Sequence, residues 1–293
     1  MQQIAPSNGI EINYETFGDP ADPTLLLVMG LGASLLAWDD GICALLVGQR
    51  FHVVRFDNRD IGHSTWIDTP DLDVGAAVFA AIGGDTSKAP YRLSDMADDT
   101  VGLLDHLGVE RAHVVGASMG GMISQTIAIE HRDRIRSLTS IMSTTGEPNV
   151  GGASPELLGT LLGERPTERD AAIEFGVHVS RAIASPDHFD EDLTRARVTR
   201  EVDHGINPLG TGRQLLAILA SGSRAEGLGN LDLPTLVIHG RHDHLVDFSG
   251  GERTVELVAG SEFLAIDDMG HDLPVVHYNR VVDEIAALAR RAD

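Results

Sequence analysis

Six short apolar runs, none of which alternates with polar positions, limit most strongly how this 293-residue chain can fold. They read TLLLVMG, FHVVRFD, AHVVGAS, SLTSIM, PTLVIHG and EFLAID, at residues 24–30, 51–57, 112–118, 137–142, 234–240 and 262–267. Such runs are typical of strands that are covered on both faces of a parallel sheet. Segments of helical length and period lie between them, such as residues 94–108, for which Ser94 is the expected N-cap. The alternation predicts the α/β class with a mostly parallel, doubly wound sheet.

Two stretches depart from this alternation. Residues 4–20 alternate apolar and polar positions around Asn8-Gly9, which predicts a hairpin with a tight turn. From residue 146 to residue 230 no strand-like run occurs, and the pattern favours three or four helices. We therefore expect a core formed by residues 1–145 and 231–293, with residues 146–230 inserted as a helical cap, or lid.

The apolar residues of the expected cap bear on the substrate. The runs LLGTLLGE (157–164) and LLAILASG (215–222) suggest an apolar roof over a hydrophobic ligand, or simply helix positions that face a core. Residues 64–95 contain a further short apolar stretch between turn-rich flanks. Their pattern leaves open whether they pack against the cap or form the edge of a pocket.

Charge and composition exclude several classes of function. The net charge of −22 argues against nucleic acid as a partner, because phosphate binding needs basic surface. The single cysteine, Cys43, allows no intrachain disulfide and lies in a helix-like run, so we expect a buried structural thiol. The chain begins with neither a basic start nor an apolar block, and no run approaches the roughly 18 apolar residues of a membrane span. We expect a cytoplasmic protein with no membrane partner, and the sequence leaves a homo-oligomer open.

The run AHVVGASMGGMISQ, residues 112–125, carries the first candidate catalytic residue. An apolar strand leads into Gly116-Ala117-Ser118-Met119-Gly120 and a helix-like run follows, which is Gly-x-Ser-x-Gly in the strand–turn–helix context that this motif requires. The glycines remove side chains that would collide in so tight a turn, and the serine hydroxyl stands at a helix N-terminus. We interpret Ser118 as a nucleophile, the alternative being an ordinary helix cap.

A serine nucleophile needs a base, and the base needs an acid that orients it. Asp243 lies in the loop after residues 234–240, and His271 in the loop after residues 262–267. Each of the three residues follows the carboxyl end of an expected strand, where ligands bind in such sheets. The sequence therefore predicts a triad of Ser118, His271 and Asp243, with Asp247 as the alternative acid.

Other titratable residues near the expected triad are assigned no catalytic role. Three aspartates flank His271 too closely to orient its ring and are expected to be surface groups: Asp267, Asp268 and Asp272. Three histidines crowd the Asp243 loop: His239, His242 and His244. A dinuclear His-x-His-x-Asp-His site would need histidine where Arg241 stands, so we expect packing or solvated roles for them, with no metal and no cofactor.

Five motifs at matching intervals resemble the α/β-hydrolase superfamily with a helical cap, over essentially the whole chain. They are LLLVMG, RFDNRDIGHST, RAHVVGASMGG, PTLVIHGRHD and MGHDLP, at residues 25–30, 55–65, 111–121, 234–243 and 269–274. Within the superfamily the chain is most similar to aclacinomycin methylesterase-type enzymes and related actinobacterial carboxylesterases. The resemblance implies the order serine, acid, histidine that Ser118, Asp243 and His271 follow.

The resemblance also implies an oxyanion hole made of backbone amides. One donor corresponds to the amide of Met119, and the other to the amide of Leu31, with Gly32 next. Many relatives have His-Gly where this chain has Met29-Gly30, which leaves the backbone donor but changes the packing beneath it.

The loop RFDNRDIGHS corresponds to one that often reads Asp-x-Arg-Gly-x-Gly-x-Ser in the superfamily. Asp60 stands where the first of those glycines would be. We expect the loop to be a scaffold near the site, the alternative being that Arg59 or His63 touches substrate.

Together these features predict a carboxylic ester hydrolase that acts on a small-molecule ester through an acyl-enzyme, and the resemblance suggests a methyl ester of a bulky compound. Two alternatives use the same triad, namely a C–C bond hydrolase and a cofactor-free perhydrolase. A hydrolase-fold receptor for a small molecule is the alternative from another class. A dinucleotide site is disfavoured, because Leu35 stands where Gly-x-Gly-x-x-Gly needs its third glycine.

Overall fold

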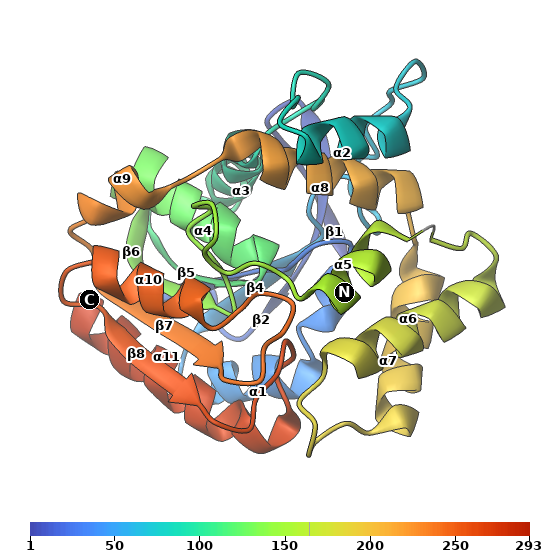
Figure 1. Ribbon diagram of the computed structural model, residues 1–293. Helices are drawn as coiled ribbons and strands as arrows, with labels where there is room; N and C mark the ends of the chain where they lie inside the picture. The colour runs from blue at the N-terminus through green and yellow to red at the C-terminus, as the bar shows by residue number, and fades with distance from the viewer. Residues whose placement is uncertain (164) are drawn as a thin grey trace.

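The computed structural model describes residues 1–163 and 165–293, and its centre is one eight-stranded sheet with the order β1-β2-β4-β3-β5-β6-β7-β8 (Figure 1). The strands are β1 (Gln3–Ser7), β2 (Ile10–Phe17), β3 (Thr24–Val28), β4 (His52–Phe56), β5 (Ala112–Ala117), β6 (Ile135–Ile141), β7 (Thr235–Gly240) and β8 (Glu262–Ile266). Strands β3 to β8 are parallel to one another, and β2 of the antiparallel hairpin β1–β2 pairs antiparallel with β4. The predicted fold class is confirmed, and so is each of the six predicted parallel strands.

The hairpin turns at Asn8 and Gly9, as the sequence predicts. Ser7 pairs with Ile10, and the two residues between them have positive φ values of 46° and 78°. A two-residue turn in which both residues have positive φ matches the twist of the strands that it joins.

Helices cover both faces of the sheet because successive side chains of each strand point to opposite sides. Leu26 and Val28 of β3 belong to a buried cluster with α3 (Leu93–His106) and α4 (Met119–Glu130). Leu25 and Leu27 belong to a second cluster, with α1 (Asp40–Gly48) and α11 (Tyr278–Ala292). Cys43 lies fully buried in the second cluster, as expected.

The predicted start of α3 is wrong. The helix begins at Leu93 rather than after Ser94. The amide of Arg92 donates to Asp95 Oδ2 at 2.7 Å, and the amide of Leu93 donates to Ser221 Oγ at 2.9 Å. The helix start is therefore satisfied partly by a residue 128 positions away, which a local capping pattern does not contain.

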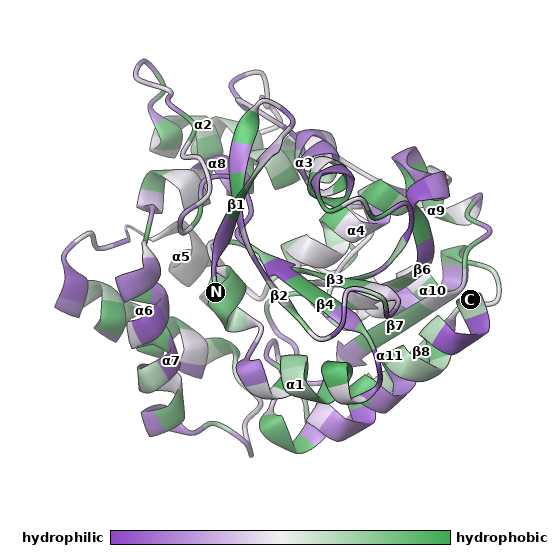
Figure 2. Cartoon of the chain, turned by 180° about the vertical axis from the view of Figure 1, so that it is seen from behind, coloured by the Kyte–Doolittle hydropathy of each residue, from purple (hydrophilic) through white to green (hydrophobic). Residues whose placement is uncertain are grey.

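Between β6 and β7 the described part of the chain contains only helices. They are α5 (Pro155–Leu162), α6 (Arg169–Ile183), α7 (Glu191–His204), α8 (Pro208–Ser221) and the short α9 (Ala225–Gly229). Helices α6 and α7 pack together through Ile173, Val177 and Val198, to one side of the sheet, and carry many hydrophilic residues (Figures 1 and 2). The expected apolar roof at residues 157–164 lies partly outside the described part of the structure. Residue 164 and the side chains of residues 158 and 160–162 are not described.

Helix α2 (Val74–Ile82) answers the question that the sequence leaves open about residues 64–95. Its residues Val74, Ala77 and Val78 form a small buried cluster with Leu216 of α8 (Figure 1). This segment therefore packs against the helices between β6 and β7, which are called the helical insertion below.

The remaining elements are short or lie at the edge. Helix α10 (Ser249–Leu257) follows β7, and three 3₁₀ turns occur: η1 (Leu35–Ala37), η2 (Arg132–Arg134) and η3 (Val275–His277). None of the helices in residues 1–163 and 165–293 combines the length and apolar character needed to cross a bilayer.

Candidate active site

Ser118 occupies the sharp turn between β5 and α4. Its backbone has φ 56° and ψ −122°, a conformation that non-glycine residues rarely adopt. Its amide donates to the carbonyl of Ile141 at 2.9 Å, and its carbonyl accepts from Ser143 Oγ at 2.8 Å. The turn is held by neighbouring strand β6, so the strained serine has a fixed position.

The two glycines of the motif are explained by close packing. A Cβ at Gly116 would lie 2.1 Å from the carbonyl oxygen of Gly120, and a Cβ at Gly120 would lie 2.1 Å from that of Val28. Both distances are shorter than any real contact, so side chains at these positions would push α4 away from β3 and β5.

Ser118, His271 and Asp243 form a hydrogen-bonded chain. His271 Nε2 lies 2.9 Å from Ser118 Oγ, and His271 Nδ1 lies 2.7 Å from Asp243 Oδ2. Because an ionised carboxylate only accepts hydrogen bonds, Nδ1 carries the proton and Nε2 of the neutral ring is left to accept from the serine. The arrangement can remove a proton from Ser118 and return it to another oxygen.

Asp243 is fully enclosed and is held as an anion. Its Oδ1 accepts from the amides of Leu245 and Val246, at 2.9 and 2.8 Å, and its Oδ2 also lies 3.3 Å from His239 Nε2. Burial alone raises the pKa of Asp243, but the charges and hydrogen bonds of His271 and His239 outweigh burial and hold this pKa well below its usual range.

The structure brings Asp243, and not Asp247, to His271. Asp247 is exposed, and its Oδ1 accepts from the amide of Ser249 at 3.0 Å, at the beginning of α10. Asp247 therefore stabilises a local turn through its side chain.

The loop after β3 approaches Ser118 closely. A Cβ on Gly30 would lie 3.1 Å from Ser118 Cβ, a tight contact that would crowd the serine. In the described part of the chain the amides of Leu31 and Met119 have no hydrogen-bond partner. The amide of Gly32 instead donates to Gln214 Oε1 at 2.9 Å, so this amide is not free to bind an oxyanion.

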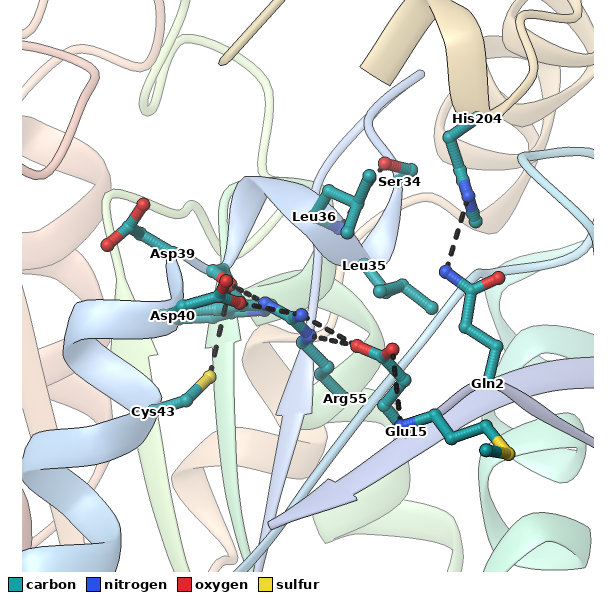
Figure 3. A network of polar contacts seen from close by, with 12 residues as sticks. Gln2, Glu15, Ser34, Leu35, Leu36, Asp39, Asp40, Cys43, Arg55 and His204 are labelled. Atoms are coloured by element: carbon teal, nitrogen blue, oxygen red, sulfur yellow. Dashed lines mark hydrogen bonds and ion pairs between the residues drawn. The ribbon is translucent and has the colours of Figure 1, made fainter. Parts of the chain in front are cut away.

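The buried guanidinium of Arg55 holds the segment that follows this loop (Figure 3). Arg55 of β4 contacts Glu15 at 2.6 Å and Asp40 at 2.8 Å, and its guanidinium donates to the carbonyl of Trp38. Burial lowers the pKa of Arg55, but the hydrogen bond and charge of Glu15, together with other acidic neighbours, outweigh burial and raise this pKa overall. The amide of Leu35 donates to Asp57 Oδ1 at 2.8 Å, so the chain is anchored four residues after Leu31, the expected oxyanion donor.

The loop RFDNRDIGHS is a scaffold, and neither Arg59 nor His63 lines the cavity at Ser118. Arg59 forms a buried ion pair with Asp99 at 2.6 Å. Asp60 is buried with a φ of 73°, and its carboxylate accepts from Arg213 of α8 at 2.6 and 2.9 Å and from the Tyr91 hydroxyl at 2.7 Å. The aspartate therefore ties the helical insertion to the sheet at a position where the superfamily often has glycine.

Sequence reasoning missed the polar residues of α8. The run at 215–222 suggests an apolar roof or helix positions that face a core, and Leu215, Ile218 and Leu219 do line the cavity. The two residues before this run, Arg213 and Gln214, are buried polar contacts to the core: Arg213 pairs with Asp60, and Gln214 donates from Nε2 to the carbonyl of Arg59 at 2.8 Å. The only sequence signal was the Arg-Gln pair at the start of an otherwise apolar helix face.

The loop that carries His271 contacts the end of α6. The amide of His271 donates to the carbonyl of Ile183 at 2.8 Å, and the amide of Gly270 donates to Ser185 Oγ at 2.8 Å. Asp272 Oδ1 accepts from the amide of Ser185 at 2.8 Å. Asp267 is exposed and pairs with Arg241, and Asp268 is partly exposed, as expected of surface groups. Asp268 and Asp272 also contact the helical insertion, which the sequence does not show.

A cavity of about 940 Å³ opens at the hydroxyl of Ser118. The sheet side of its lining includes Met29, Leu31, Met119 and Met122, and the helices of the insertion add Phe175, Val179, Leu215, Ile218 and Leu219. A largely apolar cavity of this size is at the upper end of those that enclose a drug-sized molecule.

The histidines around Asp243 do not form a cluster of metal ligands among the described residues. His239 is fully buried and its Nε2 lies 2.8 Å from the carbonyl of Val246, whereas His242 and His244 are exposed. These are the packing and solvated roles expected from the sequence.

Comparison with known proteins adds independent evidence. A family model described as alpha/beta hydrolase fold matches residues 23–278. The chain is 29% identical to rhodomycin D methylesterase of Streptomyces peucetius, over 95% of this chain and 94% of that protein. It is 28% identical to rhodomycin D methylesterase of Streptomyces sp. strain C5, over the same shares. Among solved structures, the enol-lactonase of Burkholderia xenovorans LB400 superposes with a TM-score of 0.78 at 23% identity, over 98% of this chain and 100% of that chain, which is a likeness of fold.

Proposed function

This chain belongs to the alpha/beta hydrolase fold family, and we propose that it is a carboxylic ester hydrolase that works through an acyl-enzyme on Ser118. The observation that carries the proposal is the hydrogen-bonded chain from Ser118 through His271 to Asp243, placed where a large apolar cavity begins. The recognised resemblance to actinobacterial methylesterases agrees with this chemistry.

In the acylation half-reaction, Ser118 Oγ attacks the ester carbonyl carbon while its proton moves to His271 Nε2. The carbonyl oxygen becomes an oxyanion, which the free amides of Leu31 and Met119 stabilise; one such donor is typically worth about 3 kcal/mol. The bond to the alcohol oxygen then breaks, and His271 gives its proton to that oxygen, so that the alcohol leaves and the acyl group stays on Ser118.

In the deacylation half-reaction, water replaces the alcohol. His271 Nε2 takes a proton from the water as its oxygen attacks the acyl carbon, and the same proton returns to Ser118 Oγ when the carboxylic acid departs. Asp243 keeps Nδ1 protonated and stabilises the imidazolium in both halves, and it stays ionised throughout.

We propose a hydrophobic, bulky ester as the substrate class, with the methyl ester of a polycyclic acid as the best candidate. The cavity volume of about 940 Å³ exceeds what a short acyl chain needs, and most of its lining is apolar. The two Streptomyces relatives are named for methyl ester cleavage on rhodomycin D. We further propose that residues 146–230 serve as the cap that encloses this substrate over a core of residues 1–145 and 231–293.

A panel of esters tests the proposal. Turnover is measured on p-nitrophenyl esters of increasing acyl length and on methyl esters of aromatic acids with one to four fused rings. The proposal expects kcat/KM to rise with the size of the acid part of the methyl esters. A preference for acetate esters over all larger substrates would contradict the substrate class.

The variant Ser118→Ala separates an enzyme from a receptor with the same fold. It should lose turnover of every ester while it still binds the acid product, and its melting temperature should stay near that of the parent. Ser94→Ala, which lies on α3 outside the cavity, is the matched control and should keep full turnover. Absence of turnover in the parent on the whole panel, with binding retained, would favour the receptor.

A further inference from the structure

Three potential metal ligands meet beside the loop that carries His271. They are His188, Asp268 and His277, and one ligand atom from each lies within 4.8 Å of the others. His188 Nε2 is 2.7 Å from Asp268 Oδ2, and His277 Nε2 is 3.0 Å from Asp268 Oδ1. One carboxylate therefore lies between two imidazoles, with a nitrogen near each of its oxygens.

The three residues come from different parts of the fold. His188 lies between α6 and α7 in the helical insertion, Asp268 follows β8, and His277 ends η3 just before α11. The position of His188 does not depend on a metal, because its amide donates to the carbonyl of Ser185, and Ser185 is itself bonded to Asp272 and Gly270. The ligand set is thus preorganised across the contact between insertion and core.

Hydrogen bonding within the group leaves one nitrogen unexplained. Nε2 of His277 is buried and makes no hydrogen bond in the described part of the chain, although Asp268 Oδ1 is only 3.0 Å away. The residue His277 has a relative exposure of 9%, and its side chain one of 11%. A buried polar atom without a partner is costly, and a cation between this nitrogen and the carboxylate would satisfy it.

We propose that His188, Asp268 and His277 bind a divalent transition-metal ion, with Zn²⁺ as the fitting ion, and that this ion joins the helical insertion to the core. Two imidazole nitrogens and one carboxylate oxygen are a ligand set that zinc accepts. Hard cations such as Mg²⁺ and Ca²⁺ prefer oxygen ligands alone and are disfavoured here.

Three protein ligands leave one position of a tetrahedral ion open. The side chain of Asp268 is 43% exposed, so water reaches the site and can fill that position. The side-chain hydrogen bond from His188 is the largest of the effects that lower the pKa of Asp268, which keeps the carboxylate ionised in the absence of metal as well. The net charge of −22 further favours the approach of cations.

The experiment uses the full chain after treatment with a chelator and exhaustive dialysis. Zn²⁺ alone is titrated calorimetrically, and Co²⁺ is titrated with its visible d–d absorption as a second readout of nitrogen and oxygen coordination. We expect saturable binding of one ion per chain. Binding should weaken on acidification, because protons compete for the imidazole nitrogens.

Two variants and a matched control locate the ion. Asp268→Asn and His188→Ala should each weaken Zn²⁺ binding by more than about tenfold, since losing only the partner of a ligand already costs roughly 10–100-fold. His131→Ala is the control, because His131 Nε2 lies 2.8 Å from Asp98 Oδ1 in a similar pair that belongs to no cluster of three among the described residues. Its binding should equal that of the parent.

Three results would overturn the proposal. They are no saturable binding of Zn²⁺ by the parent chain, equal affinity in Asp268→Asn and the parent, or an equal loss in His131→Ala. Circular dichroism and melting of each variant ensure that a loss is read only from folded protein. Asp268→Asn changes a partly exposed side chain, so it remains informative even if His188→Ala disturbs the contact with the core.

Discussion

Replacing Gln214 with methionine should weaken both the fold and the proposed reaction. Gln214 is fully buried in α8, where it accepts from the Gly32 amide at 2.9 Å and donates to the Arg59 carbonyl at 2.8 Å. Methionine has a similar length and no polar hydrogen, so the change leaves the buried carbonyl of Arg59 and the partly buried amide of Gly32 without partners, and creates little empty space. Each such group costs about 1–3 kcal/mol, which gives a loss of roughly 2–6 kcal/mol in the free energy of unfolding.

Thermal and urea unfolding measure this loss, and steady-state turnover of a p-nitrophenyl ester measures its effect on the site. A domain of this size loses about 2 °C of melting temperature per kcal/mol, so Gln214→Met should melt roughly 4–12 °C below the parent. Its kcat should fall as well. Without the hydrogen bond to Gln214 the backbone at Gly32 is no longer held, and the neighbouring amide of Leu31 loses its fixed direction.

The control is Gln125→Met. Gln125 is equally buried on α4, and its hydrogen bonds go to Ser140 and Arg224 rather than to the loop after β3. It should lose stability and keep its kcat at temperatures where both variants are folded. If Gln214→Met kept both the melting temperature and the kcat of the parent, the role assigned to Gln214 would be refuted.

Three further experiments, two on substitutions and one on thiol labelling, have definite expected outcomes. Asp243→Asn should lower kcat by about 10⁴, read from initial rates, because the ring of His271 loses the partner that fixes its tautomer. Folding lowers the pKa of Asp243 from 3.8, so the ionised carboxylate stabilises the parent fully above that pH, and this stabilisation is lost as the pH falls toward the folded pKa. Urea unfolding should show this loss of unfolding free energy at acidic pH in the parent and not in Asp243→Asn. Gly30→Ala, whose added Cβ would lie 3.1 Å from Ser118 Cβ, should lower kcat by about 10- to 100-fold with a much smaller change in melting temperature; unchanged kcat would mean that the space is not used. Cys43, whose pKa burial raises to about 12, should react with a thiol reagent only after denaturation, and fast labelling of the folded chain would contradict its buried position.

The parts of the molecule that short sequence patterns predict are those whose cause is local. A strand covered on both faces is apolar throughout, and the turn at Ser118 needs glycines on both sides because α4 packs at once against β3. Asp243 and His271 could be located because each follows a strand end, and parallel strands bring these ends to one edge of the sheet.

The parts that the sequence did not reveal depend on partners far along the chain. Gln214 contacts Gly32 across 182 positions, and Arg213 contacts Asp60 across 153. The start of α3 is held partly by Ser221, so a local search for a cap placed it wrongly. No periodicity or spacing encodes which helix of an insertion will touch which loop, since that follows from tertiary packing alone.

The most direct test of the proposed function is to look for the acyl group on Ser118. The chain is mixed with p-nitrophenyl butyrate, quenched in acid within the first turnover, and examined by intact-mass and peptide mass spectrometry. The proposed mechanism predicts one butyryl group per chain, on the peptide that contains Ser118, and none on Ser118→Ala. A butyryl group on another residue, or rapid hydrolysis with equal labelling of Ser118→Ala, would contradict it.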